Sequence, residues 1–306
     1  MKRLFMIVAV SLLFSLVAPA AAQDATPETG ASLLAELGYP ELRVTSDGAT
    51  SDLPTELEAG RYHVILENQG EVDIDLEFYQ LPEGITIEDL EAFFAEVAEA
   101  EGPEFAVPDF FYDMVFNGGA TSFPGETGEV VLDLVPGEWV VNLLTSDPET
   151  DEQTDSLQTL TVTGEMPEIA DLANAVDIEM AEMYFNVPDT IAAGPQIWHV
   201  FNSGFQIHHL ILSSVPEGTT KEDVAELAAA FAGPPASPEA GATPVMPALS
   251  FEDVQDVFYT LLFSNEMSNW YELDLEPGTY AMICFMPDPS GVSHVMLGMI
   301  EVFTIE

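Results

Sequence analysis

Hydrophobic and polar residues alternate in short stretches along most of the chain. Ile74, Leu76 and Phe78, for example, are each separated by an acidic residue. Such a period of two predicts a strand whose even-numbered side chains face a core. Turn signals such as Asn-x-Gly and Pro-Glu-Gly separate these stretches, so the pattern indicates many short strands.

The pattern occurs twice. Pro54–Ala95 aligns with Pro188–Ala229 without a gap, and LDLVPGEW at 132–139 matches LDLEPGTY at 273–280. We interpret this long-period similarity as the duplication of one domain, because solenoid repeats are much shorter.

Each copy also contains one predicted helix. Thr86-x-x-Asp89 and Thr220-x-x-Asp223 are typical of helix N-caps, and each precedes an alanine-rich run that ends near residue 100 or 230. The remainder of each copy is strands and turns. We therefore predict an all-β protein of two tandem Greek-key β-sandwiches, each with one inserted helix.

The predicted boundaries are 40–164 for the first half and 176–306 for the second half, joined by a short connector. At the N-terminus, a basic pair, an apolar run over Leu4–Val17 and small residues to Ala22 are typical of a secretory signal peptide, which we place at 1–22. No later apolar run is long enough to predict a membrane span. We expect a secreted or periplasmic protein.

The charge of the chain restricts its partners. Fifty-four Asp and Glu residues against five Lys and Arg residues give a formal net charge of −49. Such a field repels nucleic acids and anionic membranes, so neither is expected as a partner. A basic redox protein would be attracted to it.

The repeat also predicts which way one histidine points. His208 aligns with Ile74 of the first half, so it should face the core, whereas His209 should face outward. An imidazole in the place of a buried Ile needs a polar partner or a metal ion.

Several side chains that bind soft metals lie near the C-terminus. They are Cys284, His294 and Met299, and Gly278 and Tyr280 precede them at a regular spacing; Cys284 is the only cysteine of the chain. A thiolate, imidazoles and a thioether are ligands that suit copper. Alternatively, Cys284 is a buried cysteine that acts only as a small hydrophobic residue. Met296 is an alternative to Met299 as the residue that supplies the thioether.

Together with Asn202-x-Gly204 and His208, this series resembles the cupredoxins, such as plastocyanin. The interval between Cys284 and His294 is longer than in plastocyanin and is similar to that of the copper nitrite reductases, which are also tandem cupredoxins. The resemblance implies one type 1 copper ion with His208, Cys284 and His294 as equatorial ligands and Met299 as the axial ligand. It implies outer-sphere electron transfer by the second half.

Departures from that family pattern restrict the function further. Ile283 stands where nitrite reductases have the histidine of their second copper, so we expect a carrier or binding protein and no enzyme. The first half has Ile74 and Leu143 opposite His208 and Cys284, which predicts that it binds no copper. The alternative function is a metal-free secreted β-sandwich that presents an acidic surface to a partner.

Overall fold

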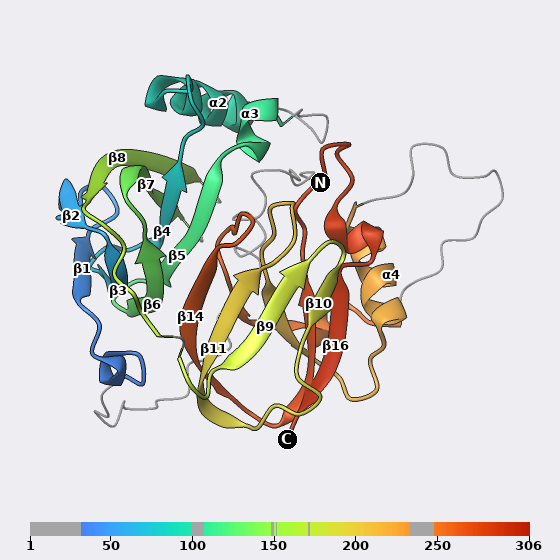
Figure 1. Cartoon of the computed structure of the whole chain (residues 1–306). Helices are drawn as coiled ribbons and strands as arrows, with labels where there is room; N and C mark the ends of the chain where they lie inside the picture. The colour runs from blue at the N-terminus through green and yellow to red at the C-terminus, as the bar shows by residue number, and fades with distance from the viewer. Residues whose placement is uncertain (1–31, 100–106, 148–149, 151, 171, 233–247) are drawn as a thin grey trace.

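The computed structural model of the chain describes residues 32–99, 107–147, 150, 152–170, 172–232 and 248–306 (Figure 1). The predicted signal peptide lies outside these ranges. We predicted an all-β protein; strands dominate the described residues, and the chain is mostly β. None of the described helices has the length and apolar character needed to cross a membrane.

The described strands form three sheets. The largest has seven strands in the order β1 (Glu41–Ser46), β3 (Gly60–Asn68), β6 (Thr127–Leu134), β14 (Ser268–Leu275), β11 (Gly194–Asn202), β9 (Val176–Ala181) and β10 (Tyr184–Asn186). The second has five in the order β2 (Glu56–Glu58), β8 (Gln153–Thr163), β7 (Gly137–Ser146), β4 (Asp73–Gln80) and β5 (Val115–Ser122). The third has four in the order β13 (Gln255–Tyr259), β12 (Ile211–Val215), β15 (Gly278–Ile283) and β16 (Ile300–Ile305).

The seven-stranded sheet contains strands from both halves of the chain, which lie side by side in Figure 1. The two halves meet where β6 pairs antiparallel with β14, with Trp270 opposite Val131. Arg61 reinforces this junction, because its guanidinium group forms two hydrogen bonds with the carboxylate of Asp133 and lies 4.0 Å from the centre of the Trp270 ring. The sequence pattern did not predict this shared sheet.

Two longer helices, α2 (Ile87–Glu99) and α4 (Lys221–Ala232), occupy the positions predicted for the inserted helices. Both begin with the predicted cap: the Thr86 hydroxyl and backbone N–H donate to Asp89, and Thr220 makes the same bonds with Asp223. The remaining described helices are short, and they are α3 (Asp109–Tyr112), η2 (Ala35–Leu37), η3 (Phe251–Asp253) and η4 (His294–Leu297).

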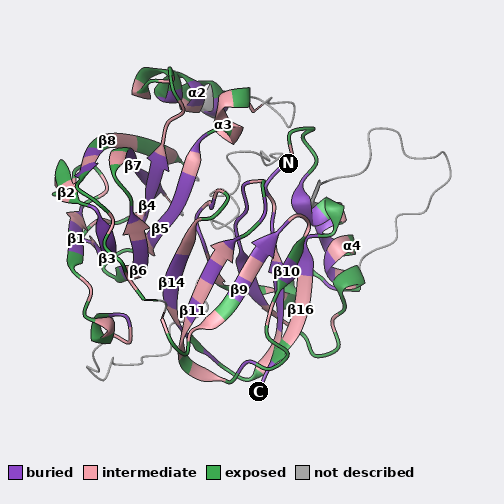
Figure 2. Cartoon of the chain, viewed as in Figure 1, coloured by how far each residue is buried: buried purple, intermediate pink, exposed green. Residues whose placement is uncertain are grey.

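The core lies between the sheets, and buried residues follow the strands while α2 and α4 carry exposed positions (Figure 2). Ile74, Leu76 and Phe78 are fully buried, as predicted. Their acidic neighbours Asp75 and Glu77 are buried as well, although the alternation places them on the outer face. That face is covered at Asp75, which accepts a hydrogen bond from Tyr259 of β13, while Glu77 accepts one from its neighbour in the same sheet, Asn142 of β7.

Candidate metal centre

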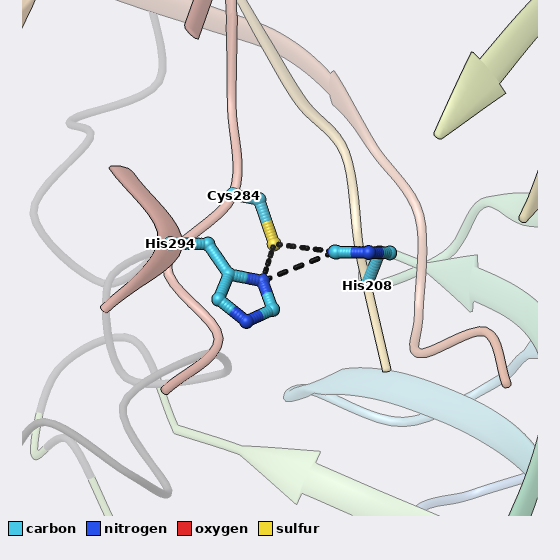
Figure 3. Close-up of side chains that lie close together, drawn as sticks. All are labelled: His208, Cys284 and His294. Atoms are coloured by element: carbon cyan, nitrogen blue, oxygen red, sulfur yellow. Dashed lines mark hydrogen bonds between the residues drawn. The ribbon is translucent and has the colours of Figure 1, made fainter. Parts of the chain in front are cut away.

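Three residues that are far apart in the sequence meet inside the second half (Figure 3). His208 lies between β11 and β12, Cys284 directly follows β15, and His294 is the first residue of η4. The structure therefore brings together three of the four side chains that the sequence singled out as metal ligands.

The potential ligand atoms of this group face one another. Cys284 Sγ lies 3.5 Å from His294 Nδ1 and 3.9 Å from His208 Nδ1, and the two Nδ1 atoms are 3.0 Å apart. All three side chains are completely buried. Among the described residues, this is the one group of at least three His, Cys, Asp or Glu side chains whose ligand atoms lie this close together.

His208 is held in place by backbone hydrogen bonds that lead to the first half. Its N–H and carbonyl groups exchange bonds of 3.0 and 2.8 Å with those of Phe263. The next residue, Ser264, donates its N–H to the carbonyl of Phe116 in β5, and its hydroxyl accepts the N–H of the same residue. A strand of the first half therefore supports a histidine of the second half.

Residues 285–293, which we call the ligand loop, join Cys284 to His294. The His294 N–H donates to the carbonyl of Met286 at 2.7 Å, which closes the loop at its base. Asp288 orders the tip, because its carboxylate accepts the N–H groups of Ser290 and Val292. These bonds fix the separation of Cys284 and His294.

The surroundings of the site favour neutral side chains. Burial raises the pKa of the Cys284 thiol to about 12, against the opposing effect of the His209 and Met286 backbone N–H groups that donate to the sulfur. Burial lowers the pKa of His294 to about 4. It also lowers the pKa of His208 to about 3, with a smaller contribution from the positive charge of a protonated His294. At neutral pH the group holds a thiol and two uncharged imidazoles.

This arrangement fits a soft or borderline metal ion. A thiolate in so buried a place needs a compensating cation, and neutral imidazole nitrogens are ready to coordinate one. His208 Nε2 is buried and has no hydrogen-bond partner among the described residues, so the polar side-chain contacts of this ring are those of Nδ1 with Cys284 and His294. One sulfur and two nitrogen ligands without a carboxylate are typical of copper sites.

The fourth predicted ligand, Met299, is fully buried and belongs to the same core cluster as Cys284. Its backbone N–H donates to the carbonyl of His294 at 2.9 Å, which ties it to the group. The alternative residue, Met296, is 45% exposed. Burial therefore favours Met299 over Met296 as the candidate thioether ligand.

One prediction about this region is wrong. His209 was expected on the outward face, but it is completely buried, and its Nε2 accepts the backbone N–H of Phe285 at 3.0 Å. The alternation fails because β12 begins only at Ile211, so the chain at residues 208 and 209 is not a regular strand. His209 links the segment before β12 to the ligand loop.

The two remaining histidines, His63 and His199, have structural partners. His63 is buried and lies 2.8 Å from a carboxylate oxygen of Glu129, and His199 lies 2.9 Å from Asp177 and stacks on Trp270.

Sequence reasoning missed Gln206, whose side-chain oxygen lies 3.2 Å from His294 Nε2. A signal was available in the repeat, because the aligned residue of the first half is the apolar Val72.

Comparisons with known proteins give structural neighbours only. No protein-family model and no curated protein matches the chain. A dithionite-reduced auracyanin from the photosynthetic bacterium Roseiflexus castenholzii is 20% identical over 44% of this chain and 99% of its own, with a TM-score of 0.28. Auracyanin A, a blue copper protein from Chloroflexus aurantiacus, is 20% identical over 43% of this chain and 99% of its own, with a TM-score of 0.25.

A copper-containing nitrite reductase from Thermus scotoductus is 12% identical over 88% of this chain and 55% of its own, with a TM-score of 0.23. Scores of this size carry no argument about the chemistry of this chain. The case for a metal centre rests on the buried group of His208, Cys284 and His294.

Proposed function

We propose that this cupredoxin-like chain is an exported protein that binds one type 1 copper ion in its second half and carries electrons by outer-sphere transfer. The ligands would be His208, Cys284 and His294, with Met299 in the axial position. The convergence of one Sγ and two Nδ1 atoms in a completely buried place carries this proposal. Copper held there would supply the Cu(II)/Cu(I) couple.

The protein's own contribution is to preform the site and keep it dry. The two imidazoles are neutral at physiological pH and need lose no proton to coordinate, whereas the Cys284 thiol must give up one. The bonds of the ligand loop and of His208 with Phe263 hold the side chains in place before a metal arrives. Little rearrangement is then required when an electron enters or leaves.

We propose a carrier and not a catalyst. Ile283 stands beside Cys284, where the family resemblance would require a histidine for a second copper. Outside the group of His208, Cys284 and His294, the described part of the chain holds no cluster of His, Cys, Asp and Glu with converging ligand atoms.

We propose further that the halves at 40–164 and 176–306 are duplicated Greek-key units. Matching hydrogen bonds support a common origin. The Asn68 side chain donates to the carbonyl of Val72 and accepts the N–H of Gly70, and the Asn202 side chain does the same with Gln206 and Gly204. The first half would serve as a metal-free support for the second.

The signal peptide predicted at 1–22 supports export to a secreted or periplasmic location. The net charge of −49 supports a basic redox protein as the partner, because opposite charges accelerate encounter. We expect the electron to pass between that protein and His294, which lies next to the partly exposed Met296 and Leu297.

A copper titration of the purified mature protein tests the proposal. Addition of Cu(II) should give a strong blue absorption band at one equivalent, and Cys284→Ala should abolish it. His63→Gln is the matched control, because it changes a buried histidine of the first half and should leave the band intact. A colourless protein without stoichiometric copper would instead favour the metal-free acidic module.

A further inference from the structure

The ring of His294 makes polar contacts on both sides. Its Nδ1 faces Cys284 and His208, and its Nε2 lies 3.2 Å from the side-chain oxygen Oε1 of Gln206. An amide oxygen only accepts hydrogen bonds, so Nε2 must carry the proton of the neutral ring. The contact with Gln206 therefore leaves Nδ1 as a bare acceptor that faces the metal centre.

Gln206 is itself held in place by its backbone. Its N–H donates to Glu182 Oε1 at 3.0 Å, and the N–H of Phe205 donates to the same oxygen. Its carbonyl accepts a bond of 2.7 Å from the Asn202 side chain. Glu182 lies between β9 and β10, so a carboxylate on one turn anchors the loop that carries Gln206.

The packing around Glu182 indicates that this anchor is built into the loop. A Cβ atom on Gly204 would lie 2.7 Å from Glu182 Oε1, so a larger residue there would force the carboxylate to move away. Burial opposes the charge of Glu182, but the backbone N–H donors of Phe205 and Gln206 outweigh burial and lower its pKa. Glu182 is therefore charged at neutral pH and accepts both bonds.

The proton on His294 Nε2 has a consequence for His208. The two Nδ1 atoms are 3.0 Å apart, which is a hydrogen-bond distance. If His294 Nδ1 is the acceptor, a hydrogen bond between the two rings requires His208 Nδ1 as its donor, and the more distant Cys284 thiol can donate to the same acceptor. His208 Nε2 then carries no hydrogen, which agrees with its burial without a partner among the described residues.

We propose that Gln206, anchored by Glu182, is a positioning residue that fixes the tautomer and orientation of His294. In the metal-free protein it sets opposite tautomers on the two histidines: His294 carries its proton on Nε2 and His208 on Nδ1. Metal binding then needs a tautomer change at His208 alone. The tautomers are a property of the metal-free chain, so this part of the proposal does not depend on copper binding. Only the expected effect of Gln206 on copper affinity rests on the proposed function.

Long-range ¹H–¹⁵N correlation of the imidazole nitrogens in the metal-free mature protein tests this proposal. The wild type should show the Nε2–H form for His294 and the Nδ1–H form for His208. Gln206→Leu removes the acceptor at similar volume, so the ratio of the two His294 tautomers should fall about fivefold, the effect of one hydrogen bond. Gln206→Glu retains an oxygen and should restore the ratio.

Two further variants separate positioning from general damage to the loop. Phe205→Ala changes the neighbouring side chain, which is 89% exposed, and should leave the tautomers unchanged. Glu182→Ala removes the anchor without touching the ring and should shift the His294 ratio in the same direction as Gln206→Leu. An unchanged ratio in Gln206→Leu, or an equal change in Phe205→Ala, would overturn the proposal.

A copper titration of the same variants separates the two proposals. Gln206→Leu should weaken copper binding about tenfold, as is typical when the hydrogen-bond partner of a ligand is lost, while Phe205→Ala binds as the wild type does. Opposite tautomers in a protein that binds no copper would support the role of Gln206 and contradict the proposed function. Equal copper affinity in Gln206→Leu and wild type would contradict the role of Gln206.

Discussion

The hydroxyl group of Tyr112 donates a hydrogen bond of 3.2 Å to the backbone carbonyl of Asp288. Tyr112 belongs to α3 of the first half, and Asp288 lies in the ligand loop of the second. The first half therefore contacts the surroundings of His208, Cys284 and His294 at two places, through this bond and through the hydrogen bonds of Phe116 in β5 with Ser264, which follows the partner of His208, Phe263.

Tyr112→Phe should loosen the ligand loop. The loss of one hydrogen bond should lower the free energy of unfolding by about 1 kcal/mol, and it should accelerate hydrogen exchange of the loop amides. Tyr62→Phe is the matched control, because the Tyr62 hydroxyl makes the same kind of bond with the carbonyl of Glu58, within the first half. Equal exchange rates in the loops of both variants would contradict a role for Tyr112.

Arg61→Gln should destabilise the junction of the halves. The guanidinium is largely buried, and its loss removes both the bidentate bond to Asp133 and the contact with Trp270, so we expect a loss of about 3 kcal/mol in urea denaturation. The comparison is Arg43→Gln. Since Arg43 is half-exposed and pairs with Glu41 and Glu67 at the surface, its replacement should cost less than about 1 kcal/mol.

Stability should fall as the pH rises from about 4.5 to about 8. Burial, with a smaller effect of Asp75, raises the pKa of Glu77 to about 8, so the folded state holds a proton that the unfolded state has lost. The folded state binds more protons in this window, and each pH unit should cost about 1.4 kcal/mol from this group.

Glu77→Gln should remove most of this slope, because the amide is always neutral and still accepts the hydroxyl bond of Tyr79. Thermal unfolding between pH 5 and pH 8 measures the effect. Glu88→Gln, at an exposed position of α2, should retain the slope of the wild type. A slope that survives in Glu77→Gln would show that other groups cause it.

Copper binding should release one proton for each ion at pH 7. The pKa of the Cys284 thiol is about 12 and those of His208 and His294 are about 3 and 4, so only the thiol has a proton to lose. The apparent affinity should then rise about tenfold per pH unit above pH 5. A pH indicator in weak buffer measures the release, and Cys284→Ser should reduce it; no release from the wild type would rule out a thiolate ligand.

Much of the site was predictable because its signals are local or repeated. The caps at Thr86 and Thr220 are short-range motifs, and the structure shows both. The alignment of His208 with Ile74 of the first half predicted that this histidine faces the core, and the family resemblance implied Cys284 and His294 as its companions. The structure brings the three side chains together.

Other features depend on contacts between distant segments. Asp75 and His209 occupy aligned positions that the alternation assigns to the outer face, yet both are buried. Tyr259 covers the first and the ligand loop covers the second, and neither neighbour is visible in the alternation itself. The repeat distinguishes Gln206 from its aligned residue Val72, but the contact of Gln206 with His294 also joins distant segments and is not visible in the alternation.

The pairing of β6 with β14 joins strands from both halves of the chain into one hydrogen-bonded sheet. If the sheet unfolds as one unit, the free energy of binding an ion at Cys284 also stabilises residues of the first half that do not contact the ion. A bound ion should protect the distant half against heat and proteases as well as its own.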